Sequence, residues 1–374
     1  MKLRLHLPAI MIALVAGFGM TCPAHALDSQ GRALDVSVMA EGFETPWSIG
    51  FLPDGGTLVT EREGRLWHIP AQGRRQQVSG LPAIRANGQG GLLDVLVPRD
   101  FSRSGEILFS FAKPQGRAEG TALAVARLSR DRTQLQNLRI LFEMAPGSAG
   151  PRHFGGRIVE GRDGTIFLTI GDRGDDDAAQ DLSRHNGKII RINRDGSVPA
   201  DNPFVNQQGA QPEIWSWGHR NPQGATLDAA GQLWINEHGA RGGDEVNRVQ
   251  RGANYGWPVI SYGRHYSGLK IGEGTAKPGM EQPVMYWDPS IAPSGMAALN
   301  GSLWPDRNGA LQDGDMLVGS LKFDYIARLS GNPLREVEQI KGRETARVRD
   351  IRQAPDGSVW FISEARGTVY RIAP

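Results

Sequence analysis

One turn-and-strand unit recurs six times along the chain and restricts the fold more than any other feature of the sequence. Each copy is a short polar turn containing glycine, followed by a strand of alternating apolar residues. A second short strand follows each copy and often ends with an arginine between two apolar residues. The six copies are Pro53–Thr60, Ser104–Ser110, Arg162–Thr169, Ala230–Asn236, Gln312–Gly319 and Pro355–Ile362. Asp-Gly turns between alternating strands are a strong signal of a β-hairpin.

Six hairpins at intervals of roughly 45 to 80 residues predict an all-β fold, a six-bladed β-propeller with four-stranded antiparallel blades. The last copy lies almost at the C-terminus, and a lone strand, Asp35–Ala40, precedes the first copy. We therefore expect this N-terminal strand to complete the last blade and close the ring. Two β-sandwich domains are the alternative, although no linker-like tract separates the repeats. Residues 262–309, rich in Gly, Pro and Tyr, are expected to form a long loop over one face.

Residues 1–26 have the pattern of a secretory signal peptide. Lys2 and Arg4 precede the apolar run Leu7–Met20, and Ala24–Ala26 has the small-x-small form of a cleavage site. The apolar run is short for a bilayer span, so a cleaved signal is favoured over a stable membrane anchor. We expect residues 27–374 to form a single propeller domain that is periplasmic or secreted.

The mature chain is expected to have balanced charge and no cysteine. The 42 basic residues lose Lys2 and Arg4 with the signal peptide, which leaves 40 basic against 40 acidic residues. Nucleic-acid-binding proteins usually carry a basic excess, so nucleic acid is not an expected partner. The only cysteine, Cys22, lies within the signal peptide. Stabilisation beyond the core must therefore come from a source other than a disulfide, such as a bound metal.

A histidine and an aspartate lie in neighbouring loops of the third repeat. His153 belongs to the glycine-rich loop Gly150–Arg157, and Asp172 follows the next strand in Thr169–Gly174. Because both loops belong to one blade, we expect the two side chains to be close. A carboxylate fixes the tautomer of an imidazole and raises its basicity, as a general base requires. A structural histidine is the alternative.

Four cationic residues come from loops of three different repeats. Arg220 precedes the fourth repeat, Lys322 follows a strand of the fifth, and Arg347 and Arg349 precede the sixth. Alternation in an extended segment places Arg347 and Arg349 on the same face. If the four cations meet at one mouth of the propeller, they indicate a multiply anionic ligand. Scattered surface cations are the alternative.

The glycine-rich segment Gly239–Tyr255 is the candidate metal site. Asp244 and Glu245 offer carboxylate oxygens, and the turn before them offers backbone carbonyls. Hard oxygen ligands without cysteine favour Ca²⁺. The spacing is not that of an EF-hand, so a polar loop with a surface acidic pair is the alternative.

Taken together, these residues resemble the soluble quinoprotein glucose and aldose sugar dehydrogenases, the glucose/sorbosone dehydrogenase family, over residues 35–372. The most specific motifs are Gly88–Leu93, His153 with Gly156-Arg157, Thr169–Asp172, Gly218–Gly224, Gly243–Glu245, Asn254–Pro258 and Arg347–Asp350. The resemblance implies a six-bladed propeller, pyrroloquinoline quinone (PQQ) as the redox cofactor, and calcium. PQQ is a tricarboxylate, which agrees with the cluster of cations.

The resemblance also implies a role for individual residues. His153 would be the general base, Asp172 its orienting partner, and Arg220 would stabilise the oxygen that becomes negative. The cofactor contacts would be Gln89, Arg220, Asn221, Tyr262, Lys322, Arg347 and Arg349. The carbonyls of Gly239 and Ala240 would hold calcium under the cofactor, and a structural calcium would be held by Glu245 and Tyr255, with Asp244 as a further candidate. The family commonly has proline where this chain has Ala240, so the loop is expected to be less stiff here.

The implied reaction is hydride transfer from C1 of an aldose sugar to PQQ, while His153 takes the hydroxyl proton and a lactone leaves. Electrons would then pass to an unidentified acceptor such as a quinone, a cytochrome or a dye. Two alternatives stay open. A calcium-dependent propeller lactonase would need several metal-ligating acids or amides on the axis, and a non-catalytic propeller that binds glycans or proteins would leave His153 and Asp172 without a role.

Overall fold

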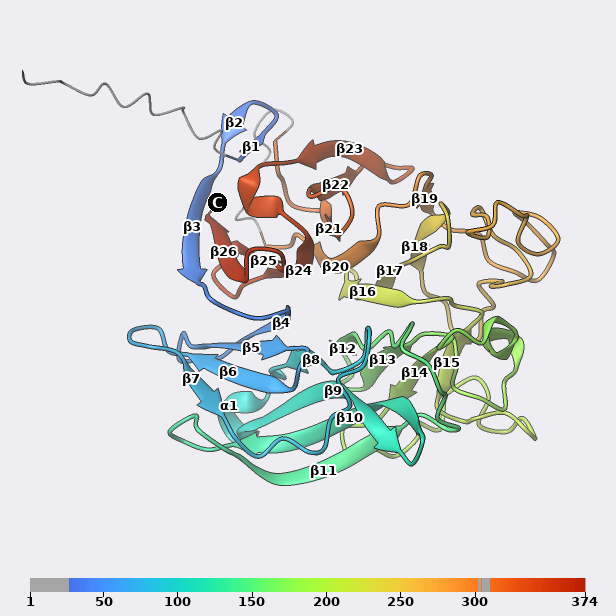
Figure 1. Ribbon diagram of the computed structural model, residues 1–374, viewed down its shortest axis with the longest axis horizontal. Helices are drawn as coiled ribbons and strands as arrows, with labels where there is room; N and C mark the ends of the chain where they lie inside the picture. The colour runs from blue at the N-terminus through green and yellow to red at the C-terminus, as the bar shows by residue number, and fades with distance from the viewer. Residues whose placement is uncertain (1–26, 302–303, 305–309, 374) are drawn as a thin grey trace, which may run out of the picture.

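The computed structural model describes residues 27–301, 304 and 310–373, and its strands form six four-stranded antiparallel sheets set around a ring (Figure 1). This arrangement is a six-bladed β-propeller, so the predicted fold class is confirmed. In the described part of the chain, helix is confined to α1 (Phe101–Ser104) and two short 3-10 turns, η1 (Asp176–Gln180) and η2 (Arg343–Thr345). The expected signal peptide lies outside the described residues.

Each blade contains four strands that follow one another from the centre of the ring outwards. The first blade consists of β4 (Pro46–Phe51), β5 (Thr57–Glu61), β6 (Arg65–Ile69) and β7 (Gln76–Val78). The second consists of β8 (Leu92–Leu96), β9 (Glu106–Gln115), β10 (Ala118–Leu128) and β11 (Leu135–Glu143). The third consists of β12 (Ile158–Glu160), β13 (Ile166–Ile170), β14 (Lys188–Ile192) and β15 (Ile214–Trp217). The fourth blade consists of β16 (Pro222–Leu227), β17 (Leu233–Glu237), β18 (Asp244–Arg248) and β19 (Met285–Trp287). The fifth consists of β20 (Pro293–Ala298), β21 (Met316–Ser320), β22 (Ile326–Ser330) and β23 (Arg335–Ile340).

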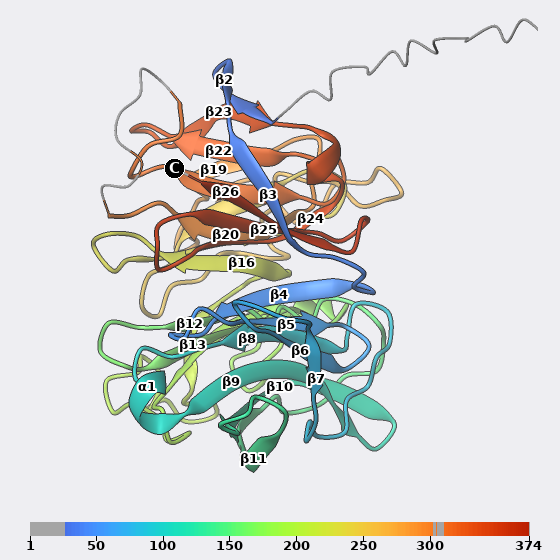
Figure 2. The same ribbon diagram turned by 90° about the vertical axis from the view of Figure 1, so that its left-hand side faces the viewer.

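The N-terminal strand closes the ring. The sixth blade consists of β24 (Val348–Gln353), β25 (Val359–Ser363), β26 (Thr368–Ala373) and, outermost, β3 (Asp35–Ala40). β3 pairs antiparallel with β26 (Figure 2). In this pairing Val36 lies opposite Ile372. The expectation that Asp35–Ala40 completes the last blade is therefore confirmed. A small two-stranded sheet, β1 (Asp28–Ser29) and β2 (Arg32–Ala33), precedes it.

Neighbouring blades pack face to face, so a strand can be buried on both sides. Leu108 and Phe109 are adjacent in β9 but belong to different apolar clusters. Phe109 shares its cluster with Leu58 of the first blade, and Leu108 shares its cluster with Leu168 of the third. Full burial of one such side chain stabilises the fold by about 1.5–3 kcal/mol. The innermost strands also pack against one another in cyclic order, which holds the loops at the end of the axis in place.

The repeated turns are stabilised by their own aspartates. Asp163 Oδ1 accepts hydrogen bonds from the backbone N–H and hydroxyl of Thr165, at 3.0 and 2.7 Å. Asp356 accepts the equivalent two bonds from Ser358. The glycines between them, Gly164 and Gly357, have φ of 82° and 81°, a conformation that glycine adopts without strain. The Asp-Gly-Thr and Asp-Gly-Ser sequences thus form turns because the side chain caps the backbone of the following strand.

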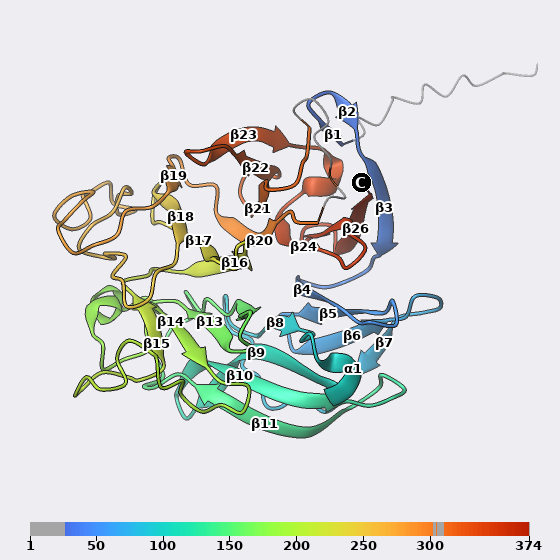
Figure 3. The ribbon, with the colours of Figure 1, turned by 180° about the vertical axis from the view of Figure 1, so that it is seen from behind.

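The prediction of one long loop over residues 262–309 is wrong. Two strands, β19 and β20, lie within that range. Pro283, Pro289 and Pro293 interrupt the alternation that would have revealed them. The extended loop instead occupies residues 249–284, between β18 and β19, and projects at the outer edge of the fourth blade (Figure 3). Among the described residues no helix has both the length and the apolar composition needed to cross a membrane.

Candidate active site

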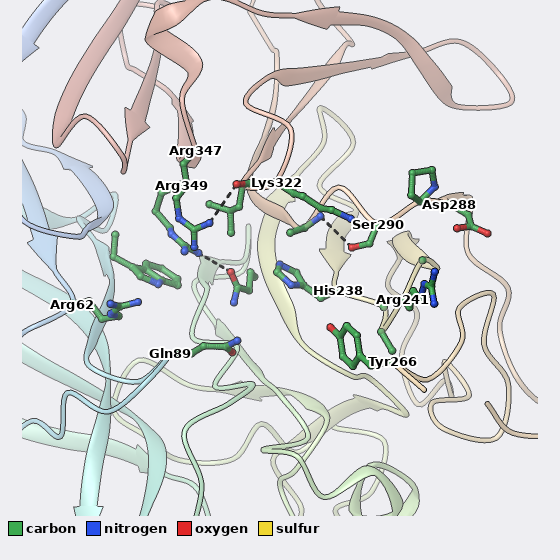
Figure 4. Close-up of a pocket in the computed structure, with 18 residues that line it drawn as sticks. Arg62, Gln89, His238, Arg241, Tyr266, Asp288, Ser290, Lys322, Arg347 and Arg349 are labelled. Carbon is green, nitrogen blue, oxygen red and sulfur yellow. Dashed lines mark hydrogen bonds between the residues drawn. The ribbon is translucent and has the colours of Figure 1, made fainter. Parts of the chain in front are cut away.

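A cavity of about 730 Å³ lies where loops from several blades meet (Figure 4). Its lining includes Trp47 of the first blade, Gln89 before the second, Gln223 of the fourth and Lys322 of the fifth. Among the described residues that line it, one side chain is acidic, Asp288, and five are cationic. The cationic residues are Arg62, Arg241, Lys322, Arg347 and Arg349. This charge imbalance makes the cavity attractive to an anion.

Arg347 and Arg349 share one carboxylate. Their Nε atoms lie 2.9 and 2.6 Å from the Glu364 carboxylate. Arg349 also donates from Nη1 to Gln223 Oε1 at 2.8 Å. Burial lowers the pKa of Arg349, although Glu364 opposes the shift. Two guanidinium groups on a single carboxylate leave a net positive charge at this wall of the cavity.

Lys322 and Gln89 lie on the same cavity but have different contacts. Lys322 forms no ion pair within the described chain, and its Nζ lies 4.9 Å from the centroid of the Phe323 ring. Gln89 accepts a hydrogen bond at Oε1 from the backbone N–H of His153, at 2.8 Å. The side chain of Gln89 therefore links the cavity wall to the histidine loop.

His153 and Asp172 form a buried hydrogen-bonded pair. His153 Nδ1 lies 2.6 Å from Asp172 Oδ1, and the Asp172 side chain has no exposed surface. Since a carboxylate accepts, Nδ1 donates, and Nε2 is left as the nitrogen that can accept a proton. Burial alone would raise the pKa of Asp172, but the hydrogen bond and charge of His153, together with the Gly174 N–H, lower it. The pair has the geometry of a base and its orienting carboxylate.

Two further groups fix the orientation of Asp172. Its Oδ1 also accepts from the Gly174 N–H at 2.7 Å, and its Oδ2 accepts from Trp257 Nε1 at 2.9 Å. Trp257 was not predicted as a site residue, although it lies in the Asn254–Pro258 motif. The carboxylate is thus held by three donors and cannot rotate away from His153.

Arg220 and Asn221 are not among the residues that line the cavity, but each is hydrogen-bonded to one that is, Gly239 and His238 respectively. Arg220 Nη1 donates to the carbonyl oxygen of Gly239, which lines the cavity, and its guanidinium lies 5.1 Å from the Trp257 ring centroid. Asn221 accepts at Oδ1 from the Gly155 N–H at 3.2 Å. The Nε of Arg220 and the Nδ2 of Asn221 are buried donors without a hydrogen-bond partner in the described protein. Unsatisfied buried donors at a cavity fit a ligand that carries several acceptor oxygens.

The candidate ligands of a cofactor metal also lie at the cavity. Gly239 and Ala240 both line it, and backbone carbonyls are ligands that Ca²⁺ accepts. The Gly239 carbonyl already accepts from Arg220, but a carbonyl oxygen has two lone pairs. Ala240 is buried against Ala179, Trp257 and Ile271. This packing restrains the loop at Ala240, the position where the resembled family commonly has proline.

Glu245 lies in a second candidate metal site, opposite a second carboxylate. It pairs across the strands with Glu237, and Asn247 Nδ2 donates to both carboxylates at 3.0 and 3.1 Å. Burial, and then the charge of Glu237, raise the pKa of Glu245 to about 8. Glu237 is buried and is also hydrogen-bonded to His219 Nδ1 at 2.9 Å and to the Arg220 N–H at 2.7 Å, whereas Glu245 is half-buried. A divalent cation beside Glu245 would offset the repulsion between the two carboxylates. Within the described chain, however, no group of three or more His, Cys, Asp or Glu side chains could hold a metal ion.

Asp244 and Tyr255 have other partners. Asp244 accepts from the Gly239 N–H at Oδ1, and from Ser290 Oγ and the Ala292 N–H at Oδ2, all within 2.7–2.8 Å. These bonds tie together two loops that line the cavity, so Asp244 has a structural role here, and its role as a metal ligand stays a prediction. The Tyr255 hydroxyl donates to the Arg248 carbonyl at 2.6 Å and accepts from the Gln250 N–H at 2.9 Å. The hydroxyl is therefore not directed at a metal.

Tyr262 does not line the cavity, in contrast to its expected place beside the cofactor. Its hydroxyl donates to Gln282 at 2.9 Å, and its ring stacks on Tyr286 with centroids 4.0 Å apart. Tyr266, four residues later in the same extended loop, lines the cavity instead. Sequence patterns do not determine the course of this loop, because it has no regular secondary structure from which side-chain direction follows.

Several cavity residues were not predicted, among them Trp47, Arg62, His238 and Arg241. His238 lies 2.7 Å from the Pro293 carbonyl through Nε2, and burial followed by the charge of Arg220 lowers its pKa to about 3. His238 is therefore neutral at ordinary pH. Position in the repeat could have revealed Arg62. It follows the second strand of its blade, as Asp172, Gly239 and Lys322 follow theirs.

Comparison with known proteins places the chain in a family. Residues 43–371 match the family described as glucose/sorbosone dehydrogenase. The chain is 40% identical over 368 residues to the aldose sugar dehydrogenase YliI of Escherichia coli K12, with 95% of this chain and 97% of that protein covered. It also matches the apo-form structure of the E. coli soluble aldose sugar dehydrogenase, at 37% identity and a TM-score of 0.86, over 91% of this chain and all of that one.

A cofactor-bound relative extends the comparison. The structure of the PQQ-bound form of an aldose sugar dehydrogenase from Streptomyces coelicolor matches at 25% identity and a TM-score of 0.74, covering 93% of this chain and 99% of that one. Fold, family profile and sequence relatives agree with one another. The chain belongs to the glucose/sorbosone dehydrogenase family of sugar-oxidising oxidoreductases.

Proposed function

We propose that this chain is a PQQ-dependent dehydrogenase that oxidises the C1 hydroxyl of aldose sugars to lactones, in the periplasm or outside the cell. The observation that carries the proposal is the His153–Asp172 pair beside a cavity with five cationic side chains. The relative from S. coelicolor whose structure contains PQQ supports the choice of cofactor. Electrons would leave to an external acceptor such as a quinone, a cytochrome or a dye.

The residues at the cavity fit a planar tricarboxylate. Lys322, Arg347 and Arg349 would bind its carboxylates, and charge-assisted hydrogen bonds of this kind are about twice as strong as neutral ones. Gln89 and Asn221 would donate amide hydrogens to its remaining oxygens. When bound, PQQ supplies the two-electron acceptor for the hydride that leaves C1.

In this proposal His153 removes the proton from the anomeric hydroxyl. Nε2 is the accepting nitrogen because Nδ1 donates to Asp172. Asp172 keeps the imidazole in that tautomer and stabilises the positive charge that the ring gains. A positioned general base contributes typically 10²–10⁴-fold to a rate. Arg220 adds a positive charge beside the cavity, where it would offset negative charge that develops during oxidation.

Calcium would have two sites in this proposal. At the cavity the carbonyls of Gly239 and Ala240 would hold it, where it would act as a Lewis acid. At the outer site, Glu245 and Glu237 would hold a structural ion between two strands. The donors at both sites are oxygens, which agrees with calcium.

The lactonase alternative receives less support. Such an enzyme needs several acids or amides around a metal on the axis, whereas the described lining of the cavity contains five cations and the single acid Asp288. A non-catalytic propeller would leave the buried His153–Asp172 pair without a function.

The proposal is tested with purified apoprotein, a dye acceptor and a panel of aldoses. We expect dye reduction that requires PQQ and Ca²⁺ together with an aldose, and that is absent when the matching lactone replaces the sugar. Lactone hydrolysis without dye reduction would instead identify a lactonase. A lack of turnover of either kind, in a protein shown to be folded, would favour the binding propeller.

A further inference from the structure

Arg62 lines the cavity but has no role in the function proposed above. It lies directly after β5 and lines the cavity, as Trp47 of the same blade does. In Figure 4 it lies on the side of the cavity where Gln89 and Arg349 are drawn. It is the cationic contribution of the first blade, whereas Lys322 belongs to the fifth and Arg347 and Arg349 to the sixth. Its position therefore adds positive charge on a side of the cavity that those three residues do not cover.

The backbone of Arg62 is fixed to the loop that carries Gln89. Its N–H donates to the Thr45 carbonyl at 3.1 Å, and its carbonyl accepts from the Leu92 N–H at 2.9 Å. The loop approaches so closely that a Cβ added at Gly91 would lie 1.9 Å from the Arg62 carbonyl oxygen. Arg62 and Gln89 are thus presented to the cavity by one rigid unit, as a binding site requires.

The guanidinium of Arg62 is weakly paired. Its nearest carboxylate is Glu63, at 3.8 Å, and the Arg62 side chain is 26% exposed. Arg65, three residues later, instead contacts two carboxylates, Glu61 and Glu44. Burial is the largest cause of the lowered pKa of Arg349, and the positive charges of Arg347 and Arg62 lower this pKa further. Glu364 pairs with Arg349 but is shared with Arg347, and Arg62 has only Glu63 at 3.8 Å. This wall of the cavity therefore carries a surplus of positive charge, which an anion would offset.

We propose that Arg62 binds a carboxylate of the cofactor, as a fourth cationic contact contributed by the first blade. The inference rests on the proposed function, because it takes PQQ as the ligand. A carboxylate is the favoured partner over a sugar hydroxyl, since aldoses are neutral and would not offset the surplus positive charge that Arg62 adds beside Arg347 and Arg349. The planar guanidinium can also bind both oxygens of a carboxylate at once.

The test is equilibrium dialysis of PQQ against apoprotein, without sugar or dye. We expect Arg62→Gln to raise the Kd of PQQ by about 10- to 100-fold, the range for a lost hydrogen bond to a charged group. Arg62→Lys keeps the charge but loses the two-pronged geometry, so its Kd should rise less. The wild-type Kd should increase with salt more steeply than that of Arg62→Gln, because one screened charge pair is missing in the variant.

Arg74→Gln is the matched control, because Arg74 is an exposed cation on the outer turn of the same blade. Its Kd for PQQ should equal that of the wild type, and thermal unfolding should show that all variants fold. If Arg62→Gln and Arg62→Lys both bind PQQ with the wild-type Kd, the inference is wrong. A raised KM for the aldose with unchanged PQQ binding would assign Arg62 to the sugar instead. Failure of the wild type itself to bind PQQ would contradict the proposed function and not only the role of Arg62.

Discussion

At the scale of single residues, the chemistry depends on which nitrogen of His153 is free. The Asp172 carboxylate determines this because it can only accept, and three donors hold it in place: His153 Nδ1, the Gly174 N–H and Trp257 Nε1. A shape-conserving change at Asp172 therefore separates the electronic role of this residue from its packing.

Asp172→Asn should lower kcat by about 10²–10⁴-fold, the range attributed to general-base catalysis. An amide can turn its NH₂ towards His153, and this would favour the tautomer in which Nε2 is protonated and cannot accept. The Kd for PQQ should stay close to that of the wild type, because Asp172 is not among the cavity-lining residues. Steady-state dye reduction together with PQQ dialysis checks both statements. A variant with the wild-type kcat would show that the carboxylate does not set the state of the base.

The sequence was informative for those site residues that lie next to a strand end. His153, Asp172 and Lys322 could be located because each belongs to a loop adjoining a recognisable strand, and the fold brings such loops to one end of the axis. Arg349 lies in the strand itself, as the second residue of β24. The side-chain direction of Tyr262 could not be predicted, because it lies in an irregular loop of the fourth blade, and it is Tyr266 of that loop that lines the cavity. The contacts of Asp244 with Ser290 and Ala292 could not be predicted, since they join segments more than 40 residues apart.

At the scale of secondary-structure elements, the site depends on close backbone contacts at the end of β13. Asp172 follows Gly171, whose position faces the backbone of His153. A Cβ added at Gly171 would lie 2.1 Å from the His153 carbonyl oxygen and 3.0 Å from its Cβ. The absence of a side chain at this position is what lets the two loops meet.

Gly171→Ala should therefore lower both stability and activity. Overpacking of this kind costs about 1–3 kcal/mol, and the shift of the His153 loop should reduce kcat as well. Gly274→Ala is a matched control, because nothing lies within 4 Å of a Cβ added there. Denaturant unfolding and dye reduction measure the two effects. Equal unfolding free energies for the two variants would show that the protein accommodates a Cβ at Gly171 without loss of stability, so the close contact with His153 would not require glycine.

A buried lysine that holds the loop between β13 and β14, which carries Asp172, gives a prediction about pH. Lys188, the first residue of β14, donates from Nζ to the carbonyls of Ala178, Ala179 and Asn186 at 2.7–3.0 Å. Burial lowers its pKa from 10.5 to about 7. Between about pH 7 and pH 10.5 the unfolded chain binds the Lys188 proton more strongly than the folded chain does. The contribution of Lys188 to stability therefore increases as the pH rises through this range.

Lys188→Met has no titrating group at this position and provides the comparison. The unfolding free energy of the wild type minus that of Lys188→Met should increase between pH 7 and pH 9, by at most about 1.4 kcal/mol per pH unit. Denaturant unfolding at several pH values measures this difference. A difference that stays constant would mean that the ammonium keeps its proton throughout the range.

At the scale of the whole molecule, the ring of blades brings distant segments to one cavity. Arg62 and Arg349 are far apart in the sequence, yet both line it, because β3 joins the last blade and the innermost strands pack in a closed cycle. The repeats predicted the blade number and the closing strand, since hairpin turns are encoded locally. The boundaries of β19 and β20 were not predicted, because prolines hide their alternation.

The central claim is that this cavity holds an anionic quinone next to a histidine base. The most direct test is an anaerobic stopped-flow experiment in which protein loaded with PQQ and Ca²⁺ is mixed with excess aldose and the quinone absorbance is followed. We expect rapid reduction by the wild type. His153→Ala should bind PQQ equally well but reduce it at least about 10²-fold more slowly. Reduction by His153→Ala at the wild-type rate, or no reduction by the wild type with any aldose, would contradict the account.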